Sequence, residues 1–229
     1  MGSPYTSKMD EKTVVDISQF SFEEFITFLF DRKVQAKTEK WNPWYWRISV
    51  SFDSRRTCEY YTRLFSAPGF LLQRFSTAQL EEGFWAISSG SHLECSVYEL
   101  IWNTDLPLAT REECVKSMLF LYRDMFATEP LETASFMWWD LLCKDLWQWG
   151  NRDRSRGGED LTMHDVMFET LVKILTLDSE HCQKAALHGL GHLNHPATEE
   201  AIRIYLAKHD SLSDEQKEYA LAAARFEVQ

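Results

Sequence analysis

The chain has 229 residues, of which 45% are hydrophobic and 26% are charged, proportions typical of a globular protein long enough to bury a sizeable core. Its formal net charge of −11 argues against binding along a nucleic acid backbone, which needs clustered Lys and Arg. We find no apolar run near the ~20 residues of a membrane-spanning helix and no apolar stretch of a secretory signal at the N-terminus. We therefore expect no membrane partner and a cytoplasmic location.

The cysteines predict a reducing compartment. The chain contains 5 of them and no C-x-x-C pair. Each lies among apolar residues at helical spacing, which is typical of small buried thiols. We expect neither disulfides nor a zinc knuckle, and the sequence predicts no bound cofactor. The cysteines are Cys58, Cys95, Cys114, Cys143 and Cys182.

The N-terminal part is predicted to combine a loose tail, a helix and a strand. Residues 1–20 are expected to be flexible or only partly ordered, and a helix follows because Ser21 and Glu24 form a capping box. In "WNPWYWRISVSFD", apolar and polar residues alternate from 44 to 52, which predicts a short β or extended segment. A lone strand needs a partner. We expect either a small hairpin with "TVVDIS" (13–18) or a segment lying on the helices.

The remaining chain is predicted to be helical almost throughout. Capping-box sequences begin at Ser76, Thr110 and Ser213, and apolar residues then recur at three- and four-residue steps. Short links with Pro or Gly favour antiparallel neighbours. The predicted fold class is all-α, an array of antiparallel helix pairs in a single domain 1–229, with the loop 150–160 as a candidate internal boundary. The predicted helices are 21–34, 54–67, 76–89, 92–103, 110–127, 131–149, 160–177, 179–194, 197–209 and 213–226.

The segment 131–149 is apolar on nearly all sides, which is typical of a central helix covered on both faces. The alternative is an exposed patch of Trp138 and Trp149 that anchors a partner. Asp140 lies off the main apolar face, and we expect it to meet solvent or a neighbouring Arg.

The segment "WNPWYWR" has two interpretations as well. Trp44 and Trp46 either cap the open end of the helical array or form an interface hot spot. We favour the cap, because end repeats must hide their apolar faces.

The loop "GNRDRSRGGED" is a local basic cluster in an acidic chain. Its arginines are a weak candidate for anion binding, since Glu159 and Asp160 follow at once and oppose an anion at the next helix N-terminus. The arginines are Arg152, Arg154 and Arg156.

The segment 179–194 is predicted to be a helix that carries a row of imidazoles. On a helical wheel its small and apolar side chains share one face, and four histidines lie about 120° round from it. Two of them are four apart and can chelate one metal ion, but Gly189 stands where H-E-x-x-H has its glutamate, and no third ligand follows at a suitable spacing. We therefore predict no metal, and expect either a polar helix flank or a partner-binding surface that responds to pH. The candidate partner-binding histidines are His181, His188, His192 and His195.

The small and apolar residues of 179–209 form a pattern of their own. It consists of "AAL" (185–187), "GLG" (189–191), the "NHP" turn (194–196) and a helix with Ala201, Ile202, Ile204, Tyr205 and Leu206. This pattern resembles a short HEAT-type repeat, as in bilin-lyase-like HEAT arrays, although His195 stands where the family often has Asp or Asn. The resemblance covers this segment alone. It implies an α-solenoid that binds another macromolecule along a concave face, with the histidine row as a candidate contact surface.

Three hypotheses of function follow. The first is a non-enzymatic protein-interaction module of HEAT-like type, such as a small acidic immunity, antitoxin or adaptor protein that holds a basic partner. The second is a metal-dependent helical enzyme centred on the stripe His181–His195, which convergence of the imidazoles on Glu180 or Asp165 would favour. The third and weakest is nucleic-acid binding through the arginine loop. No established catalytic motif is present.

Overall fold

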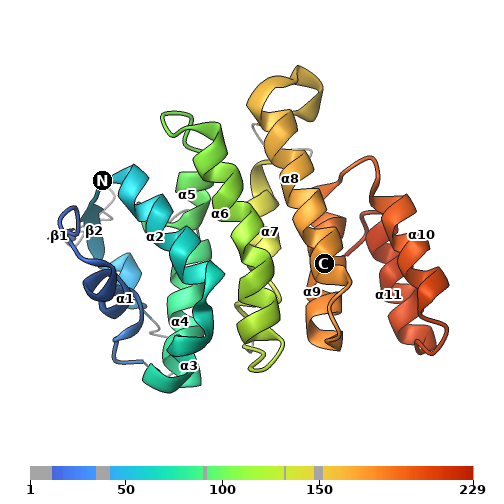
Figure 1. The fold of residues 1–229 in the computed structure, drawn as a ribbon, viewed down its shortest axis with the longest axis horizontal. Helices are drawn as coiled ribbons and strands as arrows, with labels where there is room; N and C mark the ends of the chain where they lie inside the picture. Colours follow the sequence, from blue (N-terminus) through green and yellow to red (C-terminus); the bar gives the residue numbers. More distant parts are fainter. Residues whose placement is uncertain (1–11, 35–41, 90–91, 132, 147–151, 229) are drawn as a thin grey trace, which may run out of the picture.

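The computed structural model describes residues 12–34, 42–89, 92–131, 133–146 and 152–228. Within these ranges the chain is mostly helical, as predicted, with one small two-stranded sheet. The helices follow one another in chain order along the long axis (Figure 1). They are α1 (Phe22–Phe30), α2 (Ser54–Ser66), α3 (Leu71–Arg74), α4 (Thr77–Ser88), α5 (Val97–Ile101), α6 (Leu108–Leu121), α7 (Trp138–Cys143), α8 (Gly158–Leu175), α9 (Glu180–Leu193), α10 (Thr198–Lys208) and α11 (Asp214–Ala224).

Capping chemistry fixes several helix starts. Ser21, Ser76 and Ser213 each form the predicted capping box, in which the side chain accepts a backbone N–H from the third residue on. The prediction at Thr110 is wrong, because α6 begins at Leu108. Pro107 precedes it with a φ of −53°, and its fixed ring suits the entry to a helix.

The predicted strand has the expected partner but not the expected direction. β1 (Thr13–Asp16) pairs with β2 (Ile48–Ser51) in parallel, with Thr13 opposite Ile48. A hairpin is wrong because α1 lies between the strands, and such a crossover returns the chain in parallel. Residues 44–46 form a short 3-10 helix instead of extending the strand. Residues 1–11 of the predicted tail lie outside the described ranges.

The helices pack in two rows. In one row α2 packs on α6 and α6 on α8, and in the other α4 packs on α7, α7 on α9 and α9 on α11. The buried side chains form one cluster, to which residues before and after the loop 150–160 both contribute. This loop therefore does not separate two cores. Among the described helices, none combines the length and the apolar character that crossing a bilayer requires.

The predicted helix 131–149 begins later in the structure, and its residues 147–149 lie outside the described ranges. It consists of α7 and a 3-10 turn at Lys144–Leu146. Upstream, the backbone N–H groups of Thr133 and Ala134 donate to Glu81 Oε1 at 3.0 and 3.1 Å. The carboxylate of Glu81, in α4, therefore accepts hydrogen bonds from these backbone N–H groups.

Gly189 allows α9 to approach α7 and α8 closely. A Cβ atom at this position would lie 2.6 Å from Cβ of Trp139 and 2.7 Å from Cδ2 of Leu171. These atoms cannot move aside freely in a packed interior. The close approach brings Asp140 of α7 next to two histidines of α9.

Candidate functional site

Helix α9 is covered on more faces than its own sequence predicts. Ser179 caps it by accepting the backbone N–H of Cys182, and Asn194 ends it in the left-handed conformation with a φ of 54°. Its apolar face is buried, as the helical wheel predicts. The prediction that the histidines form a row on the surface is wrong, because His188 is 0% and His195 7% exposed. The physical reason is that α9 is packed by α7, α8 and α11 together.

His181 lies at the start of the row and contacts the turn that precedes α7. Its Nε2 atom is 2.7 Å from Oγ of Ser135, and burial lowers its pKa. Glu180, one of the predicted carboxylate partners, instead accepts a hydrogen bond from Nε2 of Gln216 at 2.6 Å. This end of the row therefore contacts α11 and the turn that precedes α7.

His195 lies in a second environment beside Asp165, apart from His188 and His192, so the three imidazoles do not converge on one carboxylate as the metal-enzyme hypothesis required. Its Nδ1 atom accepts the N–H of Ala197 at 3.1 Å, so Nε2 carries the proton and donates to Asp165 at 2.9 Å. Asp165 also pairs with Arg154, whose guanidinium donates to Nδ1 of His164 at 3.2 Å. Nε2 of His164 then donates to the carbonyl of Leu193 at 2.8 Å. Because these rings have partners on both nitrogens, the network ties α8 to the turn after α9 and leaves no nitrogen for a ligand.

His188 and His192 lie in a third environment with Asp140, which we call the Asp140 cluster. The ligand atoms of the three residues all lie within 4.8 Å of one another, and Nδ1 of His192 is 3.6 Å from Oδ1 of Asp140. His188 is anchored from α11, since its Nδ1 atom is 2.9 Å from the hydroxyl of Tyr219. Nε2 of His188 and Oδ1 of Asp140 are buried without a hydrogen-bond partner.

The protonation of the Asp140 cluster follows from its burial. Burial, with the charges of His192 and Lys184 nearby, lowers the pKa of His188 to about 4. Burial also lowers the pKa of His192, and Asp140 opposes this effect. Burial raises the pKa of Asp140, which His192 opposes. His188 is therefore a neutral imidazole at neutral pH, the form that ligates metals.

A groove of about 580 Å³ lies beside this cluster, between α9, α10 and α11. Tyr205 and Tyr219 contribute aromatic rings, and Lys184 is the single basic residue of the lining. The hydroxyl of Tyr219 points away to His188, and burial raises its pKa to about 12. Three exposed carboxylates complete the lining, those of Glu180, Glu215 and Glu218.

The tryptophans divide between core and surface. Trp138 is 0% exposed and donates from Nε1 to Sδ of Met118 at 3.3 Å, so it cannot anchor a partner. Trp44 is buried against Phe28 with ring centroids 5.6 Å apart, so it is not an exposed hot spot. Trp46 is 39% exposed. Trp149 lies outside the described residues.

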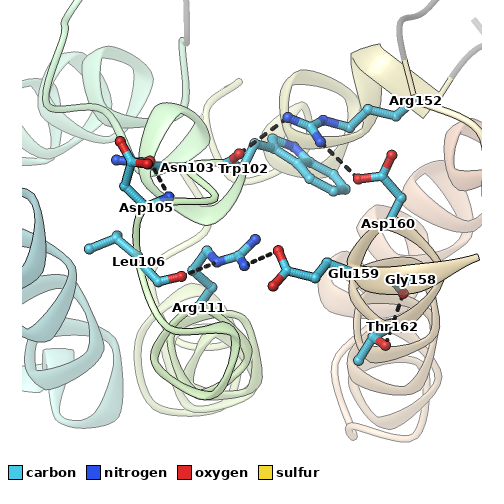
Figure 2. A network of polar contacts seen from close by, with 10 residues as sticks. All are labelled: Trp102, Asn103, Asp105, Leu106, Arg111, Arg152, Gly158, Glu159, Asp160 and Thr162. Atoms are coloured by element: carbon cyan, nitrogen blue, oxygen red, sulfur yellow. Dashed lines mark hydrogen bonds and ion pairs between the residues drawn. The ribbon is translucent and has the colours of Figure 1, made fainter.

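Arg152 and Arg154 of the loop 150–160 have carboxylate partners, and Figure 2 shows that of Arg152. Arg152 donates to Asp160 at 2.8 Å and to the carbonyl of Trp102 at 3.2 Å, and Arg154 pairs with Asp165. Arg156 is exposed. The predicted anion site thus has two of its three guanidiniums neutralised, which removes the basic surface that nucleic-acid binding needs.

Sequence reasoning missed several polar groups that the packing covers, among them Arg111, His164 and Asp140. Arg111 is 1% exposed, donates to the carbonyl of Leu106 at 3.2 Å and pairs with Glu159 (Figure 2); its place on the apolar face of α6 is a signal in the sequence. Asp140 is the third member of the histidine cluster instead of a solvent-facing group. It could not be found by spacing, since it comes from another helix.

Compared with protein-family profiles, curated proteins and solved structures, the chain gives no match.

Proposed function

We propose that the chain is a HEAT-like array of antiparallel helix pairs that binds a protein partner and is not an enzyme. The helices pack in two rows and follow one another in chain order along the long axis (Figure 1), which supports this arrangement. In α-solenoids each helix pair contacts mainly its neighbours, and the stacked pairs offer extended binding surfaces.

The acidic groove between α9, α10 and α11 carries the proposal. Its lining holds three glutamates and one lysine, and within the described part of the chain none of these glutamates forms an ion pair with Lys or Arg. The long stems of Lys and Arg pack on aromatic rings while their charged ends reach carboxylates. The occupant is therefore a Lys- or Arg-bearing segment of a partner, packed on Tyr205 and Tyr219.

The overall charge supports the same class of partner. A net charge of −11 attracts a basic protein over a distance and speeds its encounter. A small acidic protein that covers a basic effector domain, as immunity and antitoxin proteins do, is the specific form of this proposal.

Isothermal titration with defined peptides tests the groove. A lysine-rich peptide is expected to bind, with an affinity that falls as salt rises, and a glutamate-rich peptide of the same length is not. The variant Glu180→Gln/Glu215→Gln/Glu218→Gln should weaken binding about tenfold, since exposed charges contribute roughly 0.5 kcal/mol each.

A matched variant separates the groove from general attraction to an acidic protein. Glu59→Gln/Glu113→Gln/Glu169→Gln changes the net charge equally at three exposed positions outside the groove. It should keep most of the affinity. Equal losses in the two triple variants would contradict binding in the groove.

A further inference from the structure

The Asp140 cluster holds two buried polar atoms without a hydrogen-bond partner, although one of them, Oδ1 of Asp140, lies 3.6 Å from Nδ1 of His192. His188 is 0% exposed, and its Nε2 atom has no hydrogen-bond partner. The same holds for Oδ1 of Asp140, whose side chain is 14% exposed. A buried polar atom without a partner costs free energy that a folded protein normally avoids. One ligand atom each of Asp140, His188 and His192 lies within 4.8 Å of the other two.

The bond to Tyr219 orients the imidazole of His188. When Nδ1–H donates to the Tyr219 oxygen, 2.9 Å away, Nε2 keeps a lone pair that no hydrogen bond uses. Metal-ligating histidines are usually held in this way, by a hydrogen bond at the other ring nitrogen that fixes the tautomer.

The backbone brings the three groups together. His188 and His192 are four residues apart on α9 and therefore lie on one side of the helix. Asp140 comes from α7, which Gly189 allows to pack closely against α9. Two imidazoles and one carboxylate are a donor set that suits Zn²⁺ and its neighbours, whereas Ca²⁺ and Mg²⁺ prefer oxygen alone.

We propose that Asp140, His188 and His192 form a binding site for a divalent transition metal of the Zn²⁺ class. Its ligands are a carboxylate oxygen of Asp140, Nε2 of His188 and one ring nitrogen of His192. Tetrahedral zinc holds its ligand atoms roughly 3.4 Å apart, so the cluster closes by small rotations of the partly exposed side chains of Asp140 and His192, which are 14% and 18% exposed. Three protein ligands leave a fourth position for water on that exposed side.

Titration of zinc into chelator-treated full-length protein tests the site. We expect one zinc per chain and a rise in the thermal unfolding temperature. Asp140→Asn and His192→Gln preserve side-chain size and should each lower zinc affinity roughly 100-fold. Loss of a metal ligand should cost at least as much as loss of a group that only hydrogen-bonds to a ligand. His209→Gln, which removes an imidazole bound to the Tyr205 carbonyl away from the cluster, should leave the affinity unchanged.

A second measurement needs no variant. Co²⁺ added to the native protein should give visible absorption of a tetrahedral or five-coordinate N/O site, and zinc should displace it. The proposal is overturned if the native protein binds neither ion, or if Asp140→Asn and His192→Gln fold and bind zinc as tightly as the native chain. Neither outcome affects the peptide titration, since that test changes only groove glutamates.

Discussion

The hydroxyl oxygen of Tyr219 lies 2.9 Å from Nδ1 of His188, while the ring of Tyr219 lines the acidic groove. One residue of α11 thus serves both the Asp140 cluster and the groove. Tyr219→Phe keeps the ring and removes the bond, so zinc affinity should fall roughly tenfold while lysine-rich peptide affinity stays nearly the same. Titration of each ligand checks this. Unchanged zinc affinity would show that the hydroxyl does not orient His188.

Gly189→Ala should destabilise the fold and open the Asp140 cluster. The added methyl would lie 2.6 Å from Cβ of Trp139, and overpacking of this kind costs about 1–3 kcal/mol. Urea unfolding measures the loss, and zinc titration measures the separation of Asp140 from the imidazoles. Gly69→Ala is the matched control, since a Cβ there meets nothing within 4 Å. Similar stability of the two variants would contradict the close approach of α7 and α9.

Arg111 and Glu159 should contribute unequally, although they form one ion pair (Figure 2). Arg111→Ala leaves a cavity and an unpaired carbonyl at Leu106, so we expect a loss of about 2–4 kcal/mol. Glu159 is 45% exposed, and Glu159→Gln should cost less than about 1 kcal/mol. Arg55→Ala, in a pair with side chains 69% and 55% exposed, should be nearly neutral. Denaturant unfolding measures the free energy of unfolding of the three variants. Equal losses of this free energy would contradict the burial of Arg111.

The two tryptophans predicted as contacts should behave in opposite ways. Trp138 is 0% exposed, and Trp138→Ala should lower the free energy of unfolding by about 3–5 kcal/mol. Trp46→Ala, at a side chain 39% exposed, should lower it by less than about 1 kcal/mol. Thermal and urea unfolding compare them. A large loss for Trp46→Ala would mean that this ring belongs to the core.

Acid should destabilise the fold from about pH 6.5 downward. Burial lowers the pKa of both His164 and His195, so the unfolded chain binds protons at a pH where the folded chain does not. Stability is then complete above the unfolded pKa and falls as pH drops toward the folded values. Urea unfolding at a series of pH values gives the slope. His164→Gln should reduce that slope, and an unchanged slope in this variant would refute this origin.

Local features of the fold could be predicted from the sequence. The capping boxes at Ser21, Ser76 and Ser213 are confirmed because a cap depends on four consecutive residues. Alternation predicts an extended segment at 44–52, and 13–18 is one of two expected neighbours. The parallel pairing of the two strands depends on the path of α1, which no local pattern contains.

The candidate site could be predicted only in part. The wheel of 179–194 identified the buried face of α9 and the alignment of His188 with His192. It could not show that α11 packs beside His188, which is buried in the structure. Asp140 joins the cluster through packing of α7 on α9, a contact between residues far apart in sequence.

The central claim is that a basic segment binds in the groove between α9, α10 and α11. The most direct measurement is to add the lysine-rich peptide to isotope-labelled protein and map the backbone amide shifts by NMR. We predict that the largest changes gather at the groove residues Glu180, Lys184, Glu215, Glu218 and Tyr219. Changes spread evenly over acidic residues of the whole chain, or none at all, would contradict the claim.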